Sequence, residues 1–448
     1  MRGASLGISG VPGAASGSAE RFLRRNRMHW DAIDMRRVVD AYLEQMTRGL
    51  QGAGSSLPMI PTYIETSRAV PHRERVIALD AGGTNFRAAE VSFEESGKPL
   101  IEGLIRQRMP GVDAELDRDE FFRTMAGYIL PLAKKADRIG FCFSYAAEMQ
   151  PSKDGKLLYF TKEIRARGVV GELIGGNLAR ALAAASGRPP LQTVLLNDTV
   201  ATLLAGRNAQ PGRHFDDFIG VVCGTGINVA YVESHRNIGR IPGLDPAGAQ
   251  IVNTESGSFA GSPSGKIDDA YDATTSEPGR YRHEKMISGA YLGALSLFTA
   301  KAAARGGCLS PAAGAALDAV HSLSTRELND FLLYPDGREN PLGAACSRMD
   351  ADDARTLYVL CDLLVERAAV LVAVTLSAIL LKTGRGGDPR YPVCITVDGT
   401  TFWQLRSFHS RVEAHMRRFL SGARECAWEI ASVEDAPLLG AAIAALTN

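Results

Sequence analysis

The chain has 448 residues, of which 45% are hydrophobic and 22% are charged, so it is long enough for two domains with separate cores. Its 50 basic residues balance its 50 acidic residues, which gives no reason to expect a nucleic acid or a membrane as a partner. The seven cysteines are scattered and lack CxxC spacing, which argues against a disulfide framework or a zinc site and favours a cytoplasmic location.

The N-terminal region divides into a predicted tail and a predicted helix. Residues 1–27 are expected to be disordered, because about the first 18 are rich in glycine, alanine and serine and lack a compact apolar segment. They do not have the pattern of a signal peptide. From Trp30 to Leu50 apolar residues recur at helical spacing, so a long amphipathic helix is expected there.

Two strand–turn–strand units follow, and in each a turn of glycine and threonine joins two apolar strands and ends in asparagine. The first turn is Asp80-Ala81-Gly82-Gly83-Thr84-Asn85, and the second is Gly224-Thr225-Gly226-Ile227-Asn228. Glycines in such a turn let the backbone approach an anion, and an aspartate can orient a hydrated Mg²⁺. The repeated form suggests two similar α/β domains that face each other, and an ordinary tight turn is the alternative.

The other predicted elements follow from apolar periodicity and turn residues. Helices are expected over 121–134, 170–185 and 436–446 and through most of 288–382, and strands over 76–79, 86–93, 139–143, 193–196, 218–223, 229–232 and 391–397. The apolar run 368–381 has 14 residues, against roughly 20 needed to cross a bilayer. We therefore interpret this run as a buried core helix.

Several polar residues are candidates for chemistry, although each is weak evidence alone. Asn197 and Asp198 follow an apolar strand, and ligands gather at the carboxyl ends of strands in open α/β sheets. A solvated turn aspartate is the alternative. No Walker GxxxxGK[ST] motif is present. The candidates without a local pattern of their own are Thr161, Lys162, Glu255 and Glu284.

Taken together, a series of motifs between residues 57 and 448 resembles the hexokinase family, in unbroken family order. The motifs are 57–63 (LPMIPTY), 79–87 (LDAGGTNFR), Ser144, Thr161-Lys162, 197–200 (NDTV), 224–228 (GTGIN), 253–257 (NTESG), 284–293 (EKMISGAYLG) and 397–400 (VDGT).

This resemblance implies an α/β protein with a two-domain actin-like ATPase (ribonuclease H-like) fold and a cleft between small and large domains. The small domain would comprise 73–196 plus 435–448, and the large domain 28–72 plus 197–434. The implied activity is ATP-dependent phosphorylation of a hexose, with glucose expected, at its 6-hydroxyl, the first step of glycolysis. The implied cofactors are ATP and Mg²⁺, and the implied partners are the hexose and ATP.

The resemblance also implies roles for individual residues. Asp198 would be the general base that accepts the proton of the sugar hydroxyl, and Lys162 a second catalytic group that offsets developing charge. The sugar would be bound by Ser144, Thr161, Lys162, Asn197, Asp198, Asn228, Glu255 and Glu284. The nucleotide would be bound by Asp80, Gly82, Gly83, Thr84, Asn85, Arg87, Gly224, Thr225, Asp398, Gly399 and Thr400. No residue is expected to bind the metal directly, and Asp80 would reach Mg²⁺ through water.

The chain departs from the family pattern at three places. Ser256 replaces the tryptophan of a Glu-Trp-Gly motif, Ala146 replaces a proline, and 436–439 (APLL) replaces a Gly/Ser-rich loop. Two other functions fit parts of the sequence. One is a non-catalytic sugar sensor on the same scaffold, and the other is an actin-like ATPase or chaperone that needs no sugar.

Overall fold

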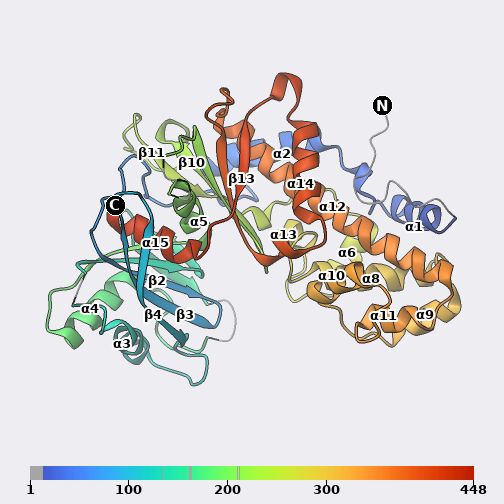
Figure 1. Cartoon of the computed structure of the whole chain (residues 1–448), viewed down its shortest axis with the longest axis horizontal. Coiled ribbons are helices and arrows are strands. Elements are labelled where there is room, and N and C mark those ends of the chain that lie inside the picture. Colours follow the sequence, from blue (N-terminus) through green and yellow to red (C-terminus); the bar gives the residue numbers. More distant parts are fainter. Residues whose placement is uncertain (1–13, 135, 161–163, 209, 211) are drawn as a thin grey trace.

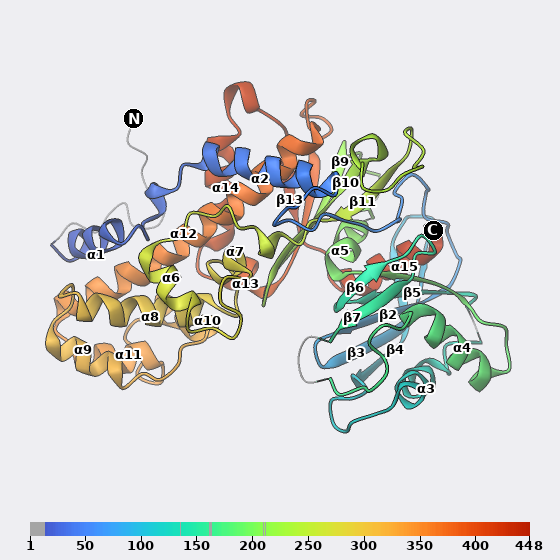
Figure 2. The same cartoon turned by 180° about the vertical axis from the view of Figure 1, so that it is seen from behind.

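The computed structural model of the chain describes residues 14–134, 136–160, 164–208, 210 and 212–448, with side chains from Gly17 onward. Within this part of the chain, two large sheets lie apart from each other and are packed against helices (Figure 1). A hairpin of β6 (Ala146–Met149) and β7 (Gly155–Tyr159) lies beside one of them (Figure 2).

The two sheets repeat one topology. The first sheet has the order β4-β3-β2-β5-β8, and the second has the order β1-β11-β10-β9-β12-β13. In each sheet the central strand, β2 or β9, pairs antiparallel with the next strand in the chain and parallel with a later strand. The bounds are β1 (Ile60–Pro61), β2 (Val76–Gly82), β3 (Asn85–Phe93), β4 (Pro99–Arg108), β5 (Arg138–Phe143), β8 (Gln192–Leu196), β9 (Asp217–Cys223), β10 (Ile227–Ser234), β11 (Ala249–Asn253), β12 (Val393–Asp398) and β13 (Trp428–Ala431).

The helices fill the space around and between the sheets. Their bounds are α1 (Ala14–Arg25), α2 (Met35–Leu50), α3 (Arg118–Ile129), α4 (Ile174–Ser186), α5 (Asp198–Arg207), α6 (Lys266–Asp272), α7 (Arg282–Lys285), α8 (Leu292–Arg305), α9 (Pro311–Asp318), α10 (Thr325–Leu333), α11 (Pro341–Cys346), α12 (Ala351–Thr383), α13 (Thr400–Gln404), α14 (Phe408–Phe419) and α15 (Ala436–Thr447). Short 3₁₀ turns occupy Trp30–Ala32, His235–Asn237, Ser256–Ser258 and Gly422–Arg424. The seven predicted strands agree with the structure to within a few residues, and the last helix to within one residue, whereas β1, β4, β6, β7, β11 and β13 were not predicted.

Helices α5 and α15 connect the two sheets, because each follows a strand of one sheet in the chain and packs on the other sheet. Helix α5 follows β8 of the first sheet but packs on β9, β10 and β12 of the second, whereas α15 follows β13 of the second sheet and packs on β2, β5 and β8 of the first. The two helices also pack on each other, and glycines make this possible. A Cβ at Gly440 of α15 would lie 2.0 Å from the carbonyl oxygen of Ala201 of α5. In the same way, a Cβ at Gly140 of β5 would lie 1.8 Å from the carbonyl oxygen of Ala441, so α15 also lies directly on β5.

This exchange supports a division of the chain into two domains, because the chain leaves the first sheet after β8 and returns to it with α15. The predicted small domain, 73–196 plus 435–448, would contain the first sheet and α15. The predicted large domain, 28–72 plus 197–434, would contain the second sheet and the remaining helices. These limits stay a prediction.

Helix α12 is the longest element and forms the centre of the larger core. It lies against α1, α2, α8 and α14, and Figure 1 shows it extending from the second sheet towards the end of the molecule away from the first. By length and hydropathy it could cross a membrane, but its most apolar stretch is entirely buried inside the protein. The prediction of a buried helix over 368–381 is therefore confirmed, within a longer helix of 33 residues.

The structure corrects the prediction that residues 1–27 are a disordered tail. From Ala14 to Arg25 the chain forms α1, which buries Ala19, Phe22 and Leu23 against α12. Spacings of three and four residues put these three side chains on one helix face, a pattern that the glycine- and serine-rich composition obscured. Residues 1–13 lie outside the described part.

The helix predicted from Trp30 to Leu50 also begins later than expected. Trp30 starts a separate 3₁₀ turn, and α2 begins at Met35. The side chain of Asp34 accepts a hydrogen bond from the backbone N–H of Arg37 at 3.2 Å and so caps the helix there.

Substitution of Gly440 by alanine tests the close crossing of α5 and α15. Gly440→Ala should lower the free energy of unfolding by about 2 kcal/mol or more, because the new methyl group would overlap the Ala201 carbonyl. Chemical denaturation measures the effect. The matched control is Gly127→Ala in α3, where nothing lies within 4 Å of the new Cβ and alanine should stabilise the helix by up to about 1 kcal/mol. Equal stability of Gly440→Ala and the wild type would contradict the described packing.

Candidate active site

The carboxyl ends of three neighbouring strands bring together residues that are distant in sequence. Asp80 lies in β2 opposite Cys142 in β5, and Cys142 lies opposite Leu196, the last residue of β8. Ser144 follows β5 directly, and its backbone N–H donates to the carbonyl oxygen of Ala81 at 3.0 Å. Because these strands are parallel, the residues that follow them gather at one edge of the sheet, as expected for a ligand site.

Asp198 is the first residue of α5, immediately after β8. Its Oδ1 accepts hydrogen bonds from the backbone N–H of Thr199 at 2.8 Å and from the Thr199 hydroxyl at 3.2 Å, and the Asn197 side chain caps the same helix. Burial raises the pKa of Asp198, and the charge of Asp80 raises it further, whereas the hydrogen bonds of Thr199 and Ser144 lower it. A carboxylate whose pKa is raised in this way is a stronger proton acceptor than an exposed one.

A second group of polar side chains belongs to the second sheet. Glu255 has a left-handed backbone, with φ 54°, and its Oε1 accepts hydrogen bonds from the amides of Asn228 at 3.1 Å and Asn253 at 2.7 Å. The Oε2 atom of Glu284 accepts one from the backbone N–H of Ile227 at 3.1 Å. A strained residue that the surroundings hold in place is typical of a functional site.

The two groups lie close enough to affect each other electrostatically. Burial raises the pKa of Glu255, and the charge of Asp198 contributes to the rise. Burial likewise raises the pKa of Glu284, to which the charge of Glu255 contributes. Three carboxylates, on α5, after β11 and on α7, therefore lie within electrostatic range of one another, beside the amides of Asn228 and Asn253. Such a set suits a ligand with many hydroxyl groups, because each carboxylate or amide can pair with one of them.

Arg87 is engaged by two carboxylates. Its Nε donates to Asp80 at 2.9 Å, and another of its nitrogens lies 2.8 Å from Asp435, the residue that precedes α15. Burial raises the pKa of Asp80, against the Arg87 charge that lowers it, and the charge of Asp398 raises it further. Asp435 was not among the predicted residues. No sequence signal connects it to Arg87, since 348 positions separate the two.

The predicted nucleotide residues form two patches. Gly82, Gly83, Thr84 and Asn85 make the turn between β2 and β3, where Gly83 has φ 67°. On the second sheet, a Cβ at Gly224 would lie 3.4 Å from Cα of Gly399, so the turn that contains Thr225 and the one that contains Asp398 and Thr400 lie together. Gly399 has φ 121°, and a side chain there would meet the backbone of Cys223 at 2.4 Å. The charge of Asp398 contributes to the raised pKa of Asp80, so the two patches lie within electrostatic range of each other.

Two predicted residues, Thr161 and Lys162, lie outside the described residues, and their roles stay predictions. The residues just before them, at the end of β7, contact the part of the molecule that contains the second sheet. The hydroxyl of Tyr159, at the end of β7, lies 3.4 Å from that of Tyr281, which immediately precedes α7.

The three departures from the family pattern lie at defined places. Ser256 is fully buried beside Glu255, and its backbone N–H donates to Asn228 at 3.3 Å. Ala146 begins β6, next to Ser144 and Tyr145. The run 436–439 forms the first turn of α15, where most of its side chains are buried.

Comparisons with known proteins identify the class. Two models of the hexokinase family match the chain, one over residues 21–208 and the other over residues 218–447. The chain is 30% identical to Hexokinase-1 of Oryza sativa over 456 residues, which covers 93% of this chain and 88% of that protein. It is 29% identical to mouse Hexokinase-3 over 436 residues, which covers 92% of this chain and only 45% of that protein, so the chain spans about half the length of this relative.

A solved structure described as hexokinase from Schistosoma mansoni complexed with glucose is similar throughout. It has a TM-score of 0.77 and 25% identity, and the match covers 96% of this chain and 99% of that one. The fold and these comparisons define a sugar-kinase phosphotransferase with the actin-like ATPase fold that was predicted. The chain belongs to the hexokinase family.

The clustered carboxylates predict how stability depends on pH. Because folding raises the pKa values of Asp198, Glu255 and Glu284, the folded protein holds protons that the unfolded chain releases. Their contribution to stability is therefore full at low pH and is lost as the pH rises through the raised values. Glu255→Gln keeps an acceptor for Asn228 and Asn253 but removes one acid, so its melting temperature should fall less than that of the wild type between about pH 5 and pH 8.

Thermal unfolding at several pH values measures this difference. The matched control is Glu44→Gln, whose side chain is 67% exposed and which should keep the pH dependence of the wild type. Parallel curves for Glu255→Gln and the wild type would contradict the predicted electrostatic cost.

Proposed function

We propose that this protein transfers the γ-phosphoryl group of Mg·ATP to the 6-hydroxyl of a hexose, with glucose the first candidate, as the entry step of glycolysis. The observation that carries the proposal is the position of Asp198. It is the first residue of α5, two positions after β8, its pKa is raised by burial, and its charge interacts with those of Asp80 and Glu255. A proton acceptor between a sugar-binding group and a phosphate-binding turn is what this transfer requires.

In the proposed reaction, Asp198 takes the proton of the 6-hydroxyl as that oxygen attacks the γ-phosphorus. The new bond joins the sugar oxygen to phosphorus, and the bond from phosphorus to the bridging oxygen breaks and leaves its electron pair on ADP. Glu255, Glu284 and Asn228 would hold the sugar, together with Ser144, Asn197, Thr161 and Lys162. Closure of the two halves would exclude water, the competing acceptor.

Magnesium would arrive with the nucleotide. Mg²⁺ in kinases is typically held by one or two carboxylates and by the phosphates of the substrate. Among the described residues no cluster of three or more metal-binding side chains is present, whereas Asp80 and Asp398 lie near enough to interact. These two carboxylates fit a site that the nucleotide completes. Because Arg87 is paired with Asp80 and Asp435, we propose that it orients Asp80 and does not itself grip the phosphates.

Release of ADP from Mg·ATP by the purified protein tests the proposal directly. With glucose, mannose, fructose or glucosamine added separately, release should depend on sugar, and the ranking will show the effect of Ser256 and Ala146 on sugar choice. Equal ADP release without sugar would indicate an ATPase. Glucose binding without any ADP release would indicate a sugar sensor.

Replacement of the proposed base tests the mechanism. Asp198→Ala should lower sugar-dependent turnover by at least about 100-fold, the low end for loss of a general base. The matched control is Asp137→Ala, whose side chain is 89% exposed on the first-sheet half and which should keep normal turnover. Near-normal turnover of Asp198→Ala would refute the assignment, provided that its circular dichroism spectrum is that of the wild type.

A further inference from the structure

Glu284 lies on a helix that is too short to be stable alone. Helix α7 has four residues, and an isolated turn of this length is unfavourable because nucleating a helix costs more than one turn of hydrogen bonds returns. The position of the Glu284 carboxylate must therefore be fixed by the neighbours of the helix. Room for it is narrow, since a Cβ at Gly226 would lie 2.6 Å from its Oε2.

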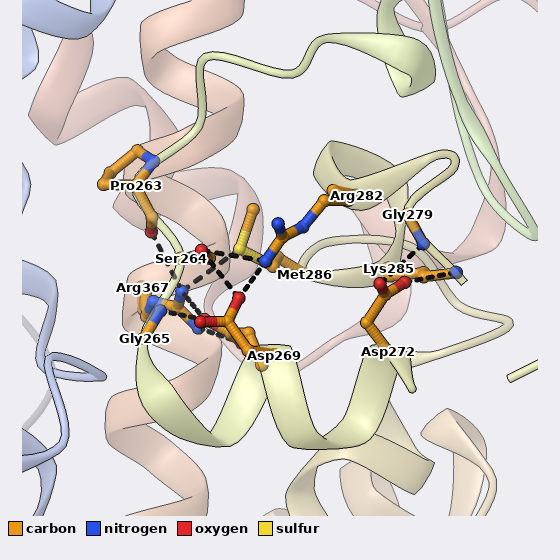
Figure 3. A network of polar contacts seen from close by, with 11 residues as sticks. Pro263, Ser264, Gly265, Asp269, Asp272, Gly279, Arg282, Lys285, Met286 and Arg367 are labelled. Atoms are coloured by element: carbon orange, nitrogen blue, oxygen red, sulfur yellow. Dashed lines mark hydrogen bonds and ion pairs between the residues drawn. The ribbon is translucent and has the colours of Figure 1, made fainter. Parts of the chain in front are cut away.

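The residue after Glu284 is anchored by a fully paired ammonium group. Lys285 is 4% exposed, and its Nζ donates to Asp272 Oδ1 at 2.5 Å, to the Thr275 hydroxyl at 2.8 Å and to the Glu277 carbonyl at 2.6 Å. An ammonium has three protons, so these three acceptors use all of them. Figure 3 shows Lys285 and Asp272 pointing toward each other below Gly279.

Asp272 completes this arrangement from the end of α6. Its second oxygen accepts the backbone N–H of Gly279 at 2.7 Å. Burial would raise the pKa of Asp272, but the hydrogen bonds of Lys285 and Gly279 outweigh it and lower the pKa below its usual value. The segment 272–279 is thus folded around one buried ion pair.

The residue before Glu284 is fixed as well. His283 is fully buried, with Nδ1 2.5 Å from the Ser262 hydroxyl and Nε2 2.9 Å from the Thr375 hydroxyl of α12. Arg282 pairs with Asp269 of α6 and donates to the Ser264 hydroxyl at 2.9 Å, in contacts that are partly exposed to solvent. Buried polar contacts therefore hold the chain on both sides of Glu284.

We propose that Lys285 is a positioning residue for sugar binding: its buried ion pair with Asp272 fixes α7 so that the Glu284 carboxylate meets the hexose. This inference rests on the proposed function, in which Glu284 binds the sugar. Lys285 itself does not touch the substrate, because all three of its protons are directed into segment 272–279. The same segment leads to Tyr281, whose hydroxyl lies 3.4 Å from that of Tyr159, so the pair also fixes a contact with the other half of the molecule.

The test measures glucose binding and steady-state kinetics of Lys285→Met. The dissociation constant and KM for glucose should rise about 10-fold or more, the usual loss for a hydrogen-bonded charged partner. The KM for Mg·ATP and kcat at saturating sugar should stay within about 3-fold, since neither depends on this contact. The matched control is Arg282→Met on the same helix. Its ion pair with Asp269 is partly exposed, unlike that of Lys285, and its loss should change glucose affinity by less than about 2-fold.

A double-mutant cycle separates positioning from general damage. If Lys285 acts through Glu284, Lys285→Met should cost little further glucose affinity in a Glu284→Gln background, whereas independent effects would add. If Lys285→Met does not fold, Thr275→Val removes one of the three acceptors with little change in shape and should raise the glucose KM by a few-fold.

The outcomes distinguish this inference from the proposed function. A wild-type protein that neither binds glucose nor phosphorylates any sugar would refute the proposed function. An active wild type with unchanged glucose affinity in both Lys285→Met and Thr275→Val would overturn only the positioning role. Additive losses in the double-mutant cycle would overturn it too.

Discussion

Helices α5 and α15 cross at a point where Gly440 leaves no room for a side chain, and the arrangement of the site depends on this contact. Each helix begins shortly after a strand of one sheet and packs on the other sheet. Asp198 is the first residue of α5, and Asp435 immediately precedes α15. The crossing therefore sets the distance between two carboxylates, one of which is the proposed base while the other holds Arg87 against Asp80. Packing between backbones, which tolerates little displacement, thus controls the geometry of charged groups.

The site is built at a cost to the stability of the fold. Asp198, Glu255 and Glu284 are acids with raised pKa values that repel one another, and Glu255 has a left-handed backbone. Such groups persist only where the surroundings hold them. Here the amides of Asn228 and Asn253 and the anchored helix α7 do so. A ligand whose hydroxyl groups donate to these carboxylates would relieve part of this strain, which favours binding to the preformed site.

The centre of the site could be predicted because its residues stand in sequence motifs. Contacts between segments that are distant in sequence could not be predicted. Asp198 and the glycine turns stand in local patterns, and the repeated turns indicated the repeated sheets. Glu255 and Glu284 have no such pattern of their own and were found only through the family order of the motifs around them. The pairing of Arg87 with Asp435 depends on a helix that returns from the other half of the chain, so no spacing reveals it. Helix α1 was missed because overall composition was weighed above the spacing of three apolar residues. The domain limits, Thr161 and Lys162 stay predictions.

The exchange of helices between the sheets also bears on how the protein is made. The first sheet is complete once β8 ends at Leu196, but the helix that covers its apolar face begins only at Ala436. A ribosome-bound chain therefore carries one face of this sheet uncovered while α12 and all strands of the second sheet except β1 are synthesised. A bare apolar face favours association with other chains, so this half is more exposed to aggregation during synthesis than a domain that is contiguous in sequence. For the same reason, a fragment that ends at β8 would be aggregation-prone in isolation.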